Sequence, residues 1–430
     1  MEPRMESGFR LDFDNIPFDI LLYYYEYSEL ARILFQGDPV MEVYLDNAAT
    51  TAVLPEIAAA MADIMIRRYG NPSGVYKQSR EAAEIVLEAR TQVADLLGAA
   101  PQEIYFTGGG SEGDNMLLRG AAHCYRHKGK HIITTQIEHH AVLNTCKALE
   151  KEGFEVTYLP VSAGGRIDPA AVEQAIRKDT VLISVMYANN ETGVLQPVRE
   201  VGDIARAKGI LFHTDAVQAA GHVPIDVEAD HIDLLTLTAH KFHGPKGCGA
   251  VYIRRGTVME PLVYGGPQER GWRAGTENVP GIYGLGRAAA HARQVMATVA
   301  ERVQGLRDLL IRRVLTEIPG TELNGSRTGR LPNNANFLIR GVSGEEMLLL
   351  LDFADIAASV GSACASGSLD PSHVLLAMGR SPEEAAGSLR LTLSEFTTET
   401  EINYTVDKLK EVVERLRAAE RDGDPRGTVR

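Results

Sequence analysis

"TVLISVMYANNETGVLQPVREVGDIARAKGILFHTDA", residues 180–216, holds two apolar runs with an amphipathic segment between them. The runs at 180–188 and 210–216 are nearly continuous in apolar residues, which is typical of strands buried on both faces of a sheet. The segment at 199–209 has the spacing of an amphipathic helix. A strand, a helix and a second strand in this order predict two parallel strands joined by a crossover helix.

The same alternation extends outward in both directions from this unit. Further strands are predicted at 103–107, 131–136, 154–160 and 233–241, and further helices at 55–70, 79–98, 141–152 and 170–177. The sequence therefore predicts an α/β fold whose mainly parallel sheet is covered by helices on both faces. We assign residues 51–295 to this large domain.

The pattern of predicted elements changes after about residue 280. One long helical stretch at 286–318 is followed by short segments at 335–340, 344–352, 356–360 and 388–393, and by a last amphipathic helix at 398–420. These elements predict a smaller α+β domain, made of residues 41–50 and 296–418. Residues 419–430 are expected to be a disordered tail.

Residues 1–40 differ from the rest of the sequence. They contain Tyr23, Tyr24, Tyr25 and Tyr27 and lack the basic start and apolar core of a signal peptide. We expect Met41 to be the natural start and residues 1–40 to be an upstream extension. The alternative is that residues 19–35 form an additional docking helix.

Composition limits the classes of function. The 57 acidic residues outnumber the 44 basic ones and give a net charge of −13, which argues against nucleic acid or an anionic membrane as the main partner. No apolar run is long enough for a transmembrane helix. The four cysteines are scattered, which indicates reduced thiols, a cytoplasmic location and no stable metal site built from several cysteines.

Polar and titratable residues follow the predicted strands at their carboxyl ends, where α/β sheets bind ligands. Each alone could be a surface or helix-capping residue, but five strand ends carry such residues together. They are Gly110 and Ser111, then Glu138, His139 and His140, then Asn189, Asn190 and Glu191, then Asp215 and Gln218, and finally Thr238, His240 and Lys241.

"TGGGSEGDN", residues 107–115, is a glycine-rich turn that leads into a helix. Free amides at a helix start bind phosphate, and glycine allows close approach, so Gly110 and Ser111 are candidate phosphate ligands. The alternative is that Ser111 is only an N-cap, with Asp114 completing a weak capping box. The stretch is neither a Walker loop nor a G-x-G-x-x-G fingerprint.

"TLTAHKFHGPKG", residues 236–247, is more specific. Lys241 ends an apolar strand, where its pKa can be lowered and its amine can form a Schiff base with an aldehyde. A lysine that extends to solvent at the sheet edge is the alternative. Thr238 could bind a phosphate, and Lys246 is interpreted as a surface lysine rather than a phosphate ligand.

"HTDAVQ", residues 213–218, places Asp215 on a different strand end. A buried carboxylate facing a pyridine nitrogen keeps that nitrogen protonated and makes the ring an electron sink. Gln218 could donate to a ring oxygen. The alternative for Asp215 is a helix N-cap.

Together these residues resemble the pyridoxal-phosphate enzymes of the class V aminotransferase family. Longer motifs resemble its NifS/IscS group of cysteine desulfurases, over about residues 43–415. These motifs are "YLDNAATT" (44–51), "YGNPSG" (69–74), "NNETG" (189–193), "HGPKG" (243–247), "ERGWRAGTEN" (269–278) and "GSACASGSLDPSHVLLAMG" (361–379). The resemblance implies an aspartate aminotransferase-like fold and conversion of L-cysteine to L-alanine.

The resemblance also implies roles for individual residues. Lys241, Cys364 and His139 would be catalytic, with Lys241 carrying the cofactor, His139 stacking on its ring and Cys364 accepting the sulfur as a persulfide. Asn190 and Arg390 would bind the substrate, Arg390 through its carboxylate. The cofactor, pyridoxal 5'-phosphate (PLP), would be held by Gly110, Ser111, His139, Asn190, Asp215, Gln218, Thr238, His240 and Lys241, and by Thr276 of a second subunit in a homodimer.

The implied partner is a sulfur-acceptor protein, which could be an iron–sulfur scaffold, a tRNA-thiolation carrier or a nitrogenase-specific partner, and Cys364 could transiently ligate a cluster. The chain departs from the family pattern at Ser111, where threonine is frequent, at Thr238, where serine is frequent, and at Pro267, where glycine is usual. The alternatives are a selenocysteine lyase, an ordinary aminotransferase, which would not need Cys364, and a non-catalytic scaffold of the same fold.

Overall fold

The computed structural model describes residues 41–361 and 371–421. Its centre is a seven-stranded sheet in the order β2-β8-β7-β6-β5-β3-β4. Along that order the strands are β2 (Ile104–Thr107), β8 (Gly249–Ile253), β7 (Leu234–Thr238), β6 (Leu211–Asp215), β5 (Thr180–Ser184), β3 (His131–Thr135) and β4 (Glu155–Leu159). Only β8 runs in the direction opposite to the other strands of this sheet, so the predicted mainly parallel sheet is confirmed.

Both faces of this sheet are buried, because successive side chains of each strand point to opposite faces. Ile132 packs into one core with the helices at 110–125 and 140–151, whereas Ile133 packs into another with those at 77–97 and 198–208. The helices of this domain are α2 (Pro55–Arg67), α3 (Lys77–Leu97), α4 (Gly110–Tyr125), α5 (His140–Lys151), α6 (Pro169–Ala175) and α7 (Val198–Lys208).

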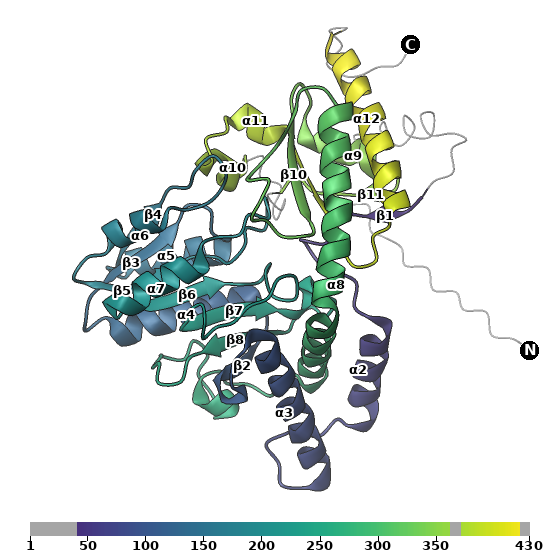
Figure 1. The fold of residues 1–430 in the computed structure, drawn as a ribbon. Helices are drawn as coiled ribbons and strands as arrows, with labels where there is room; N and C mark the ends of the chain where they lie inside the picture. The colour runs from purple at the N-terminus through teal and green to yellow at the C-terminus, as the bar shows by residue number, and fades with distance from the viewer. Residues whose placement is uncertain (1–40, 362–370, 422–430) are drawn as a thin grey trace, which may run out of the picture.

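A smaller unit packs at the other end of the molecule (Figure 1). Its antiparallel sheet has the order β12-β10-β9, from β12 (Ser388–Thr392), β10 (Asn334–Ile339) and β9 (Thr321–Leu323). Its helices are α9 (Gly344–Asp352), α10 (His373–Ala377), α11 (Pro382–Ala386) and α12 (Glu399–Arg421). Helix α12 thus includes residues 419–421, which the sequence assigned to the tail. Strand β1 (Val43–Tyr44) pairs with β11 (Ile356–Ala357), so the first described segment joins this unit.

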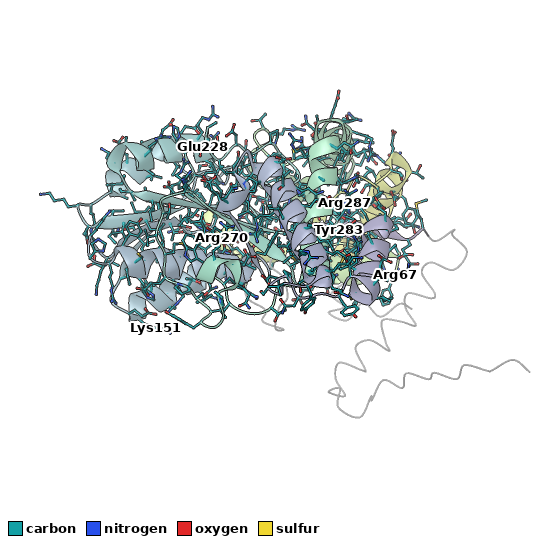
Figure 2. All side chains as sticks on the ribbon, turned by 90° about the horizontal axis from the view of Figure 1, so that it is seen from below. Arg67, Lys151, Glu228, Arg270, Tyr283 and Arg287 are labelled. Carbon is teal, nitrogen blue, oxygen red and sulfur yellow. The ribbon has the colours of Figure 1, made fainter. Side chains whose placement is uncertain are left out.

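Helix α8 (Val279–Glu317) connects the two units (Figure 1). Leu285 in its first half packs in the core of the large sheet, whereas Leu310 in its second half packs against β10 and β12. Figure 2 shows its first half from below, where Tyr283 and Arg287 lie on the same side of the molecule as Arg67 of α2. The predicted boundary at 295/296 falls inside this continuous helix and stays a prediction.

The carboxyl ends of the parallel strands meet at one edge of the large sheet and hold the site. β5 ends at Ser184, earlier than the predicted 188, although the amides of Val185 and Tyr187 still donate to carbonyls of β6. β7 ends at Thr238 and is followed by a short 3-10 turn, Ala239–Lys241. Of the helices in the described residues, none combines the length and the apolar character that crossing a membrane requires.

Candidate active site

A cavity of about 460 Å³ lies at the carboxyl edge of the large sheet. Segments of both units line it. Arg390 comes from β12 of the smaller unit, and Ala48 and Gly361 come from the segments that follow β1 and β11. The structure brings ten predicted site residues together here: Gly110, Ser111, His139, Asn190, Asp215, Gln218, Thr238, His240, Lys241 and Arg390. Thr276 is exposed and does not line this cavity, and Cys364 lies outside the described residues.

The start of α4 forms one end of the cavity. Helix α4 begins at Gly110, after Gly109, whose φ of 151° is a conformation that residues with a side chain rarely adopt. Ser111 lies inside the helix, so its interpretation as an N-cap is wrong. The unpaired amides of a first helical turn bind anions, and Thr238, His240 and the exposed Lys246 line the adjoining hollow.

Lys241 lies beside the segment that follows strand β1. Its Nζ donates to the carbonyl oxygens of Ala48 (2.6 Å) and Ala49 (2.7 Å). Burial lowers the pKa of Lys241 to about 8, because a charged amine loses hydration there, and the positive charge of Arg390 adds to the effect. The amine is therefore neutral over an accessible pH range, and a neutral amine can attack an aldehyde.

His139 caps α5 and faces the cavity. The amide of Ala141 donates to Nδ1 of His139 (3.1 Å), so the proton of the neutral ring lies on Nε2. The surrounding protein lowers the pKa of His139, while the carboxyl of Asp215 opposes that shift. The ring is thus a neutral, oriented surface for an aromatic group.

Asp215 lies at the end of β6 in the floor of the cavity. It is buried, and its Oδ1 accepts a hydrogen bond from the amide of Val217 (2.9 Å). Burial, followed by the nearby carboxyl of Asp114, raises the pKa of Asp215 to about 7. A buried carboxyl of this kind needs a cation or a proton, which a ring N–H would supply.

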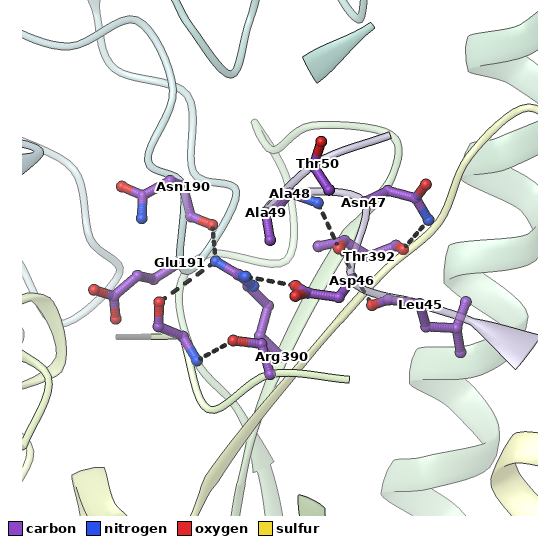
Figure 3. A network of polar contacts seen from close by, with 12 residues as sticks. Leu45, Asp46, Asn47, Ala48, Ala49, Thr50, Asn190, Glu191, Arg390 and Thr392 are labelled. Atoms are coloured by element: carbon purple, nitrogen blue, oxygen red, sulfur yellow. Dashed lines mark hydrogen bonds and ion pairs between the residues drawn. The ribbon is translucent and has the colours of Figure 1, made fainter. Parts of the chain in front are cut away.

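Arg390, on β12, lies opposite the large sheet. Its Nη2 is 2.7 Å from Asp46 Oδ1, and its Nη1 donates to the carbonyl of Asn190 (3.0 Å), as Figure 3 shows. Its Nε is buried and has no hydrogen-bond partner among the described residues. Nη1 also donates to the carbonyl of Gly361 (3.4 Å), so the guanidinium is held rigidly beside the cavity that it lines.

Sequence reasoning missed several residues that support the site. The carbonyl of Ala48 accepts from both Lys241 and Gln218 Nε2 (2.9 Å), and Asp46 holds Arg390. Both lie in "YLDNAATT", which was noted only for its resemblance. Asp114 lines the cavity too, although it was considered only as part of a helix cap. The roles of these residues depend on contacts between segments that lie far apart in the sequence, and the spacing of motifs along the sequence does not reveal such contacts.

The donor set of this cavity fits PLP. A helix start with two hydroxyl-bearing residues and an imidazole can hold a phosphate, Lys241 offers an amine of lowered pKa, and Asp215 offers a carboxyl without a cation. The unpartnered buried atoms, Asp114 Oδ1 and Arg390 Nε, indicate that the cavity is built around a polar ligand.

The comparison with known families agrees with this site. The family model for aminotransferase class-V matches residues 43–405. Among curated proteins, the chain is similar to cysteine desulfurase IscS of Dictyoglomus turgidum, at 50% identity over 87% of this chain and 95% of that protein. It is also 52% identical to cysteine desulfurase IscS of Methanosarcina thermophila, over 87% of this chain and 93% of that one. The chain belongs to the class-V aminotransferase family, in its NifS/IscS-type group.

Solved structures give the same result. The chain is similar to a NifS-like protein with a TM-score of 0.82 and 38% identity, over 87% of this chain and 100% of that one. It is also similar to SspA in complex with cysteine, with a TM-score of 0.74 and 36% identity, over 83% of this chain and 100% of that one. The predicted PLP-transferase type of fold is thereby confirmed.

Proposed function

We propose that this protein is a PLP-dependent cysteine desulfurase. It would convert L-cysteine and the Cys364 thiol into L-alanine and a Cys364 persulfide, a reaction in which all atoms balance. The observation that carries the proposal is the single cavity that holds Lys241, Asp215 and Arg390, in a chain about half identical to cysteine desulfurases. The similarity to SspA in complex with cysteine supports the choice of substrate.

PLP, when bound, withdraws electrons from the α-carbon of an amino acid. Lys241 would hold this cofactor covalently, and its neutral amine would then take and return the α-proton. Gly110, Ser111, Thr238 and His240 would bind the phosphate, and Gln218 would contact the ring oxygen.

The other residues would orient the reactants. Asp215 would pair with the ring nitrogen and keep it protonated, and His139 would lie against the ring. Asn190 and the guanidinium of Arg390, which both line the cavity, would bind the substrate carboxylate. Cys364 would attack the substrate sulfur as a thiolate, because the thiolate is the nucleophilic form of cysteine.

The oligomeric state, the cellular location and the sulfur acceptor are also proposals. We expect a homodimer in which Thr276 of one subunit completes the phosphate site of the other, and a cytoplasmic enzyme. The sulfur acceptor would be an iron–sulfur scaffold or a tRNA-thiolation carrier, with Cys364 as a transient cluster ligand.

The test is to measure alanine and sulfide released from L-cysteine in the presence of a thiol reductant. Wild type should form the two products in equal amounts, because reduction of the persulfide releases one sulfide for each alanine. Cys364→Ala should lose at least about a hundredfold in both, since the sulfur has no acceptor on the enzyme.

The matched control is Cys124→Ala, which removes a free, partly exposed thiol from α4 and should leave both rates unchanged. Alanine formation that persists in Cys364→Ala would contradict the role of that thiol. Alanine formation that requires a keto acid would instead indicate an aminotransferase.

A further inference from the structure

Asp114, on α4, is one of two buried carboxyls in the cavity lining that the proposed reaction leaves without a role. The other, Glu191, accepts a hydrogen bond from the hydroxyl of Ser372. Asp114 Oδ1 has no hydrogen-bond partner among the described residues. A buried carboxyl group with an unpaired oxygen is costly, and such a group is often functional.

Asp114 lies next to the carboxyl that would face the cofactor. One ligand atom each of Asp114, His139 and Asp215 lie within 4.8 Å of one another. Two buried carboxyls at this separation cannot both ionise easily, because like charges repel strongly in a site that burial has desolvated. Burial raises the pKa of Asp114 to about 7, and the Asp114 carboxyl contributes to the raised pKa of Asp215.

The groups around Asp114 do not supply a compensating charge within the described part of the chain. His213 Nε2 lies 3.6 Å from Asp114 Oδ1, but burial lowers the pKa of His213 to about 4, so the ring is neutral. Nδ1 of that ring contacts Ser184 Oγ at 2.8 Å. A hydrogen bond from Thr236 favours the charged form of Asp114 but does not outweigh burial. The titratable groups that face the pair are Glu138, His139, His213 and Lys241, and the amine of Lys241 interacts with Asp215 rather than with Asp114.

We propose that Asp114 and Asp215 share one proton, and that Asp114 is a positioning residue that keeps this proton when a cationic ring nitrogen lies against Asp215. Asp215 would then be the ionised member of the pair. A negative Asp114 would weaken this arrangement, since a second charge would compete for the same cation. The ring-nitrogen part of the proposal depends on the proposed function, whereas the shared proton does not.

The test is an infrared titration of the carboxyl stretch of the full chain labelled with ¹³C-aspartate, with and without PLP. Between about pH 5 and about pH 7, wild type should show a protonated aspartate, and in Asp114→Asn this signal should be lost at a pH at least about one unit lower, because the remaining carboxyl no longer shares its proton. PLP should move the loss of this proton to higher pH by at least about one unit, because Asp215 is then fixed as the ionised partner.

Asp215→Asn provides a second, independent measurement. It removes the competing charge, so the remaining carboxyl, Asp114, should titrate at least about one pH unit lower than in the wild type without PLP. Asp63→Asn, at an exposed carboxyl paired with Arg67, should change neither signal.

Two results would overturn the proposal: an unchanged protonated signal in Asp114→Asn, or an unshifted Asp114 titration in Asp215→Asn. Failure of the chain to bind PLP at all would contradict the proposed function instead. The titration without PLP would still test the shared proton.

Discussion

At the scale of single residues, Lys241 links burial to reactivity. Burial lowers its pKa from 10.5 to about 8, so the nucleophilic neutral amine predominates above about pH 8. We expect the rate at which the protein without cofactor captures PLP to rise with pH and to level off above about pH 8, whereas an ordinary lysine would become more reactive up to about pH 10. Stopped-flow absorbance of the bound aldehyde measures this rate.

The neighbouring lysine is the control for this profile. Lys246→Ala removes an exposed amine at the rim of the phosphate hollow and should slow capture without moving the midpoint. Lys241→Ala should abolish the covalent absorbance. A midpoint near pH 10 in wild type would show that Lys241 is not buried as described.

The same pKa shift affects stability in a defined direction. The unfolded chain binds the Lys241 proton more readily than the folded one, so this group lowers the free energy of unfolding by its full amount below about pH 8. This destabilisation decreases as the pH rises from about 8 to 10.5, and above that pH neither state holds the proton.

At the scale of elements, α8 carries two glycines in opposite surroundings. A methyl group at Gly286 would lie 2.5 Å from the Cα of Ala89 on α3, whereas one at Gly305 would meet nothing within 4 Å. Gly286→Ala should lower the free energy of unfolding by about 1–3 kcal/mol, because α3 and α8 must separate. Gly305→Ala should raise it by up to about 1 kcal/mol through helix propensity.

Urea denaturation of the full chain, followed by circular dichroism, compares these two variants under the same conditions. Both substitutions add one methyl group to the same helix. Opposite changes in the free energy of unfolding would therefore separate the effect of packing against α3 from the effect of helix propensity. A Gly286→Ala variant as stable as wild type would contradict the close approach of α3 and α8. A destabilised Gly305→Ala variant would contradict the open surroundings of Gly305.

The elements also show what the sequence could predict. The central strands β5 and β7 were found because both of their faces are buried and their sequences are mostly apolar. β8 was missed, since "GAVYI" at 249–253 is short and its antiparallel pairing with β2 and β7 depends on tertiary contacts. The strand-end residues of the site follow from the α/β rule, whereas Asp46 and Ala48 reach the site only because β1 pairs with β11.

At the scale of the whole molecule, one segment of the chain exposes many apolar side chains. Between the end of α2 and the start of α3, the exposed fractions are 57% for Met65, 73% for Ile66, 74% for Tyr69, 89% for Val75 and 55% for Tyr76. Exposed apolar residues gathered in this way are typical of an interface with another protein. The exposed Thr276 also lies outside the cavity of its own chain, as a residue that serves a second subunit would.

We therefore predict that this segment joins two copies of the chain. The double variant Ile66→Glu, Val75→Glu should elute as a monomer in size-exclusion chromatography with light scattering, because two charges buried in an interface are costly. It should also hold PLP at least about tenfold more weakly, since Thr276 of the partner subunit would no longer reach the phosphate.

The control is Leu376→Glu, which adds a charge at an exposed apolar residue of α10 and should leave the dimer intact. A double variant that stays dimeric would place the interface elsewhere. A monomer that retains PLP as firmly as wild type would show that each subunit completes its own phosphate site, and Thr276 would then have no role in cofactor binding.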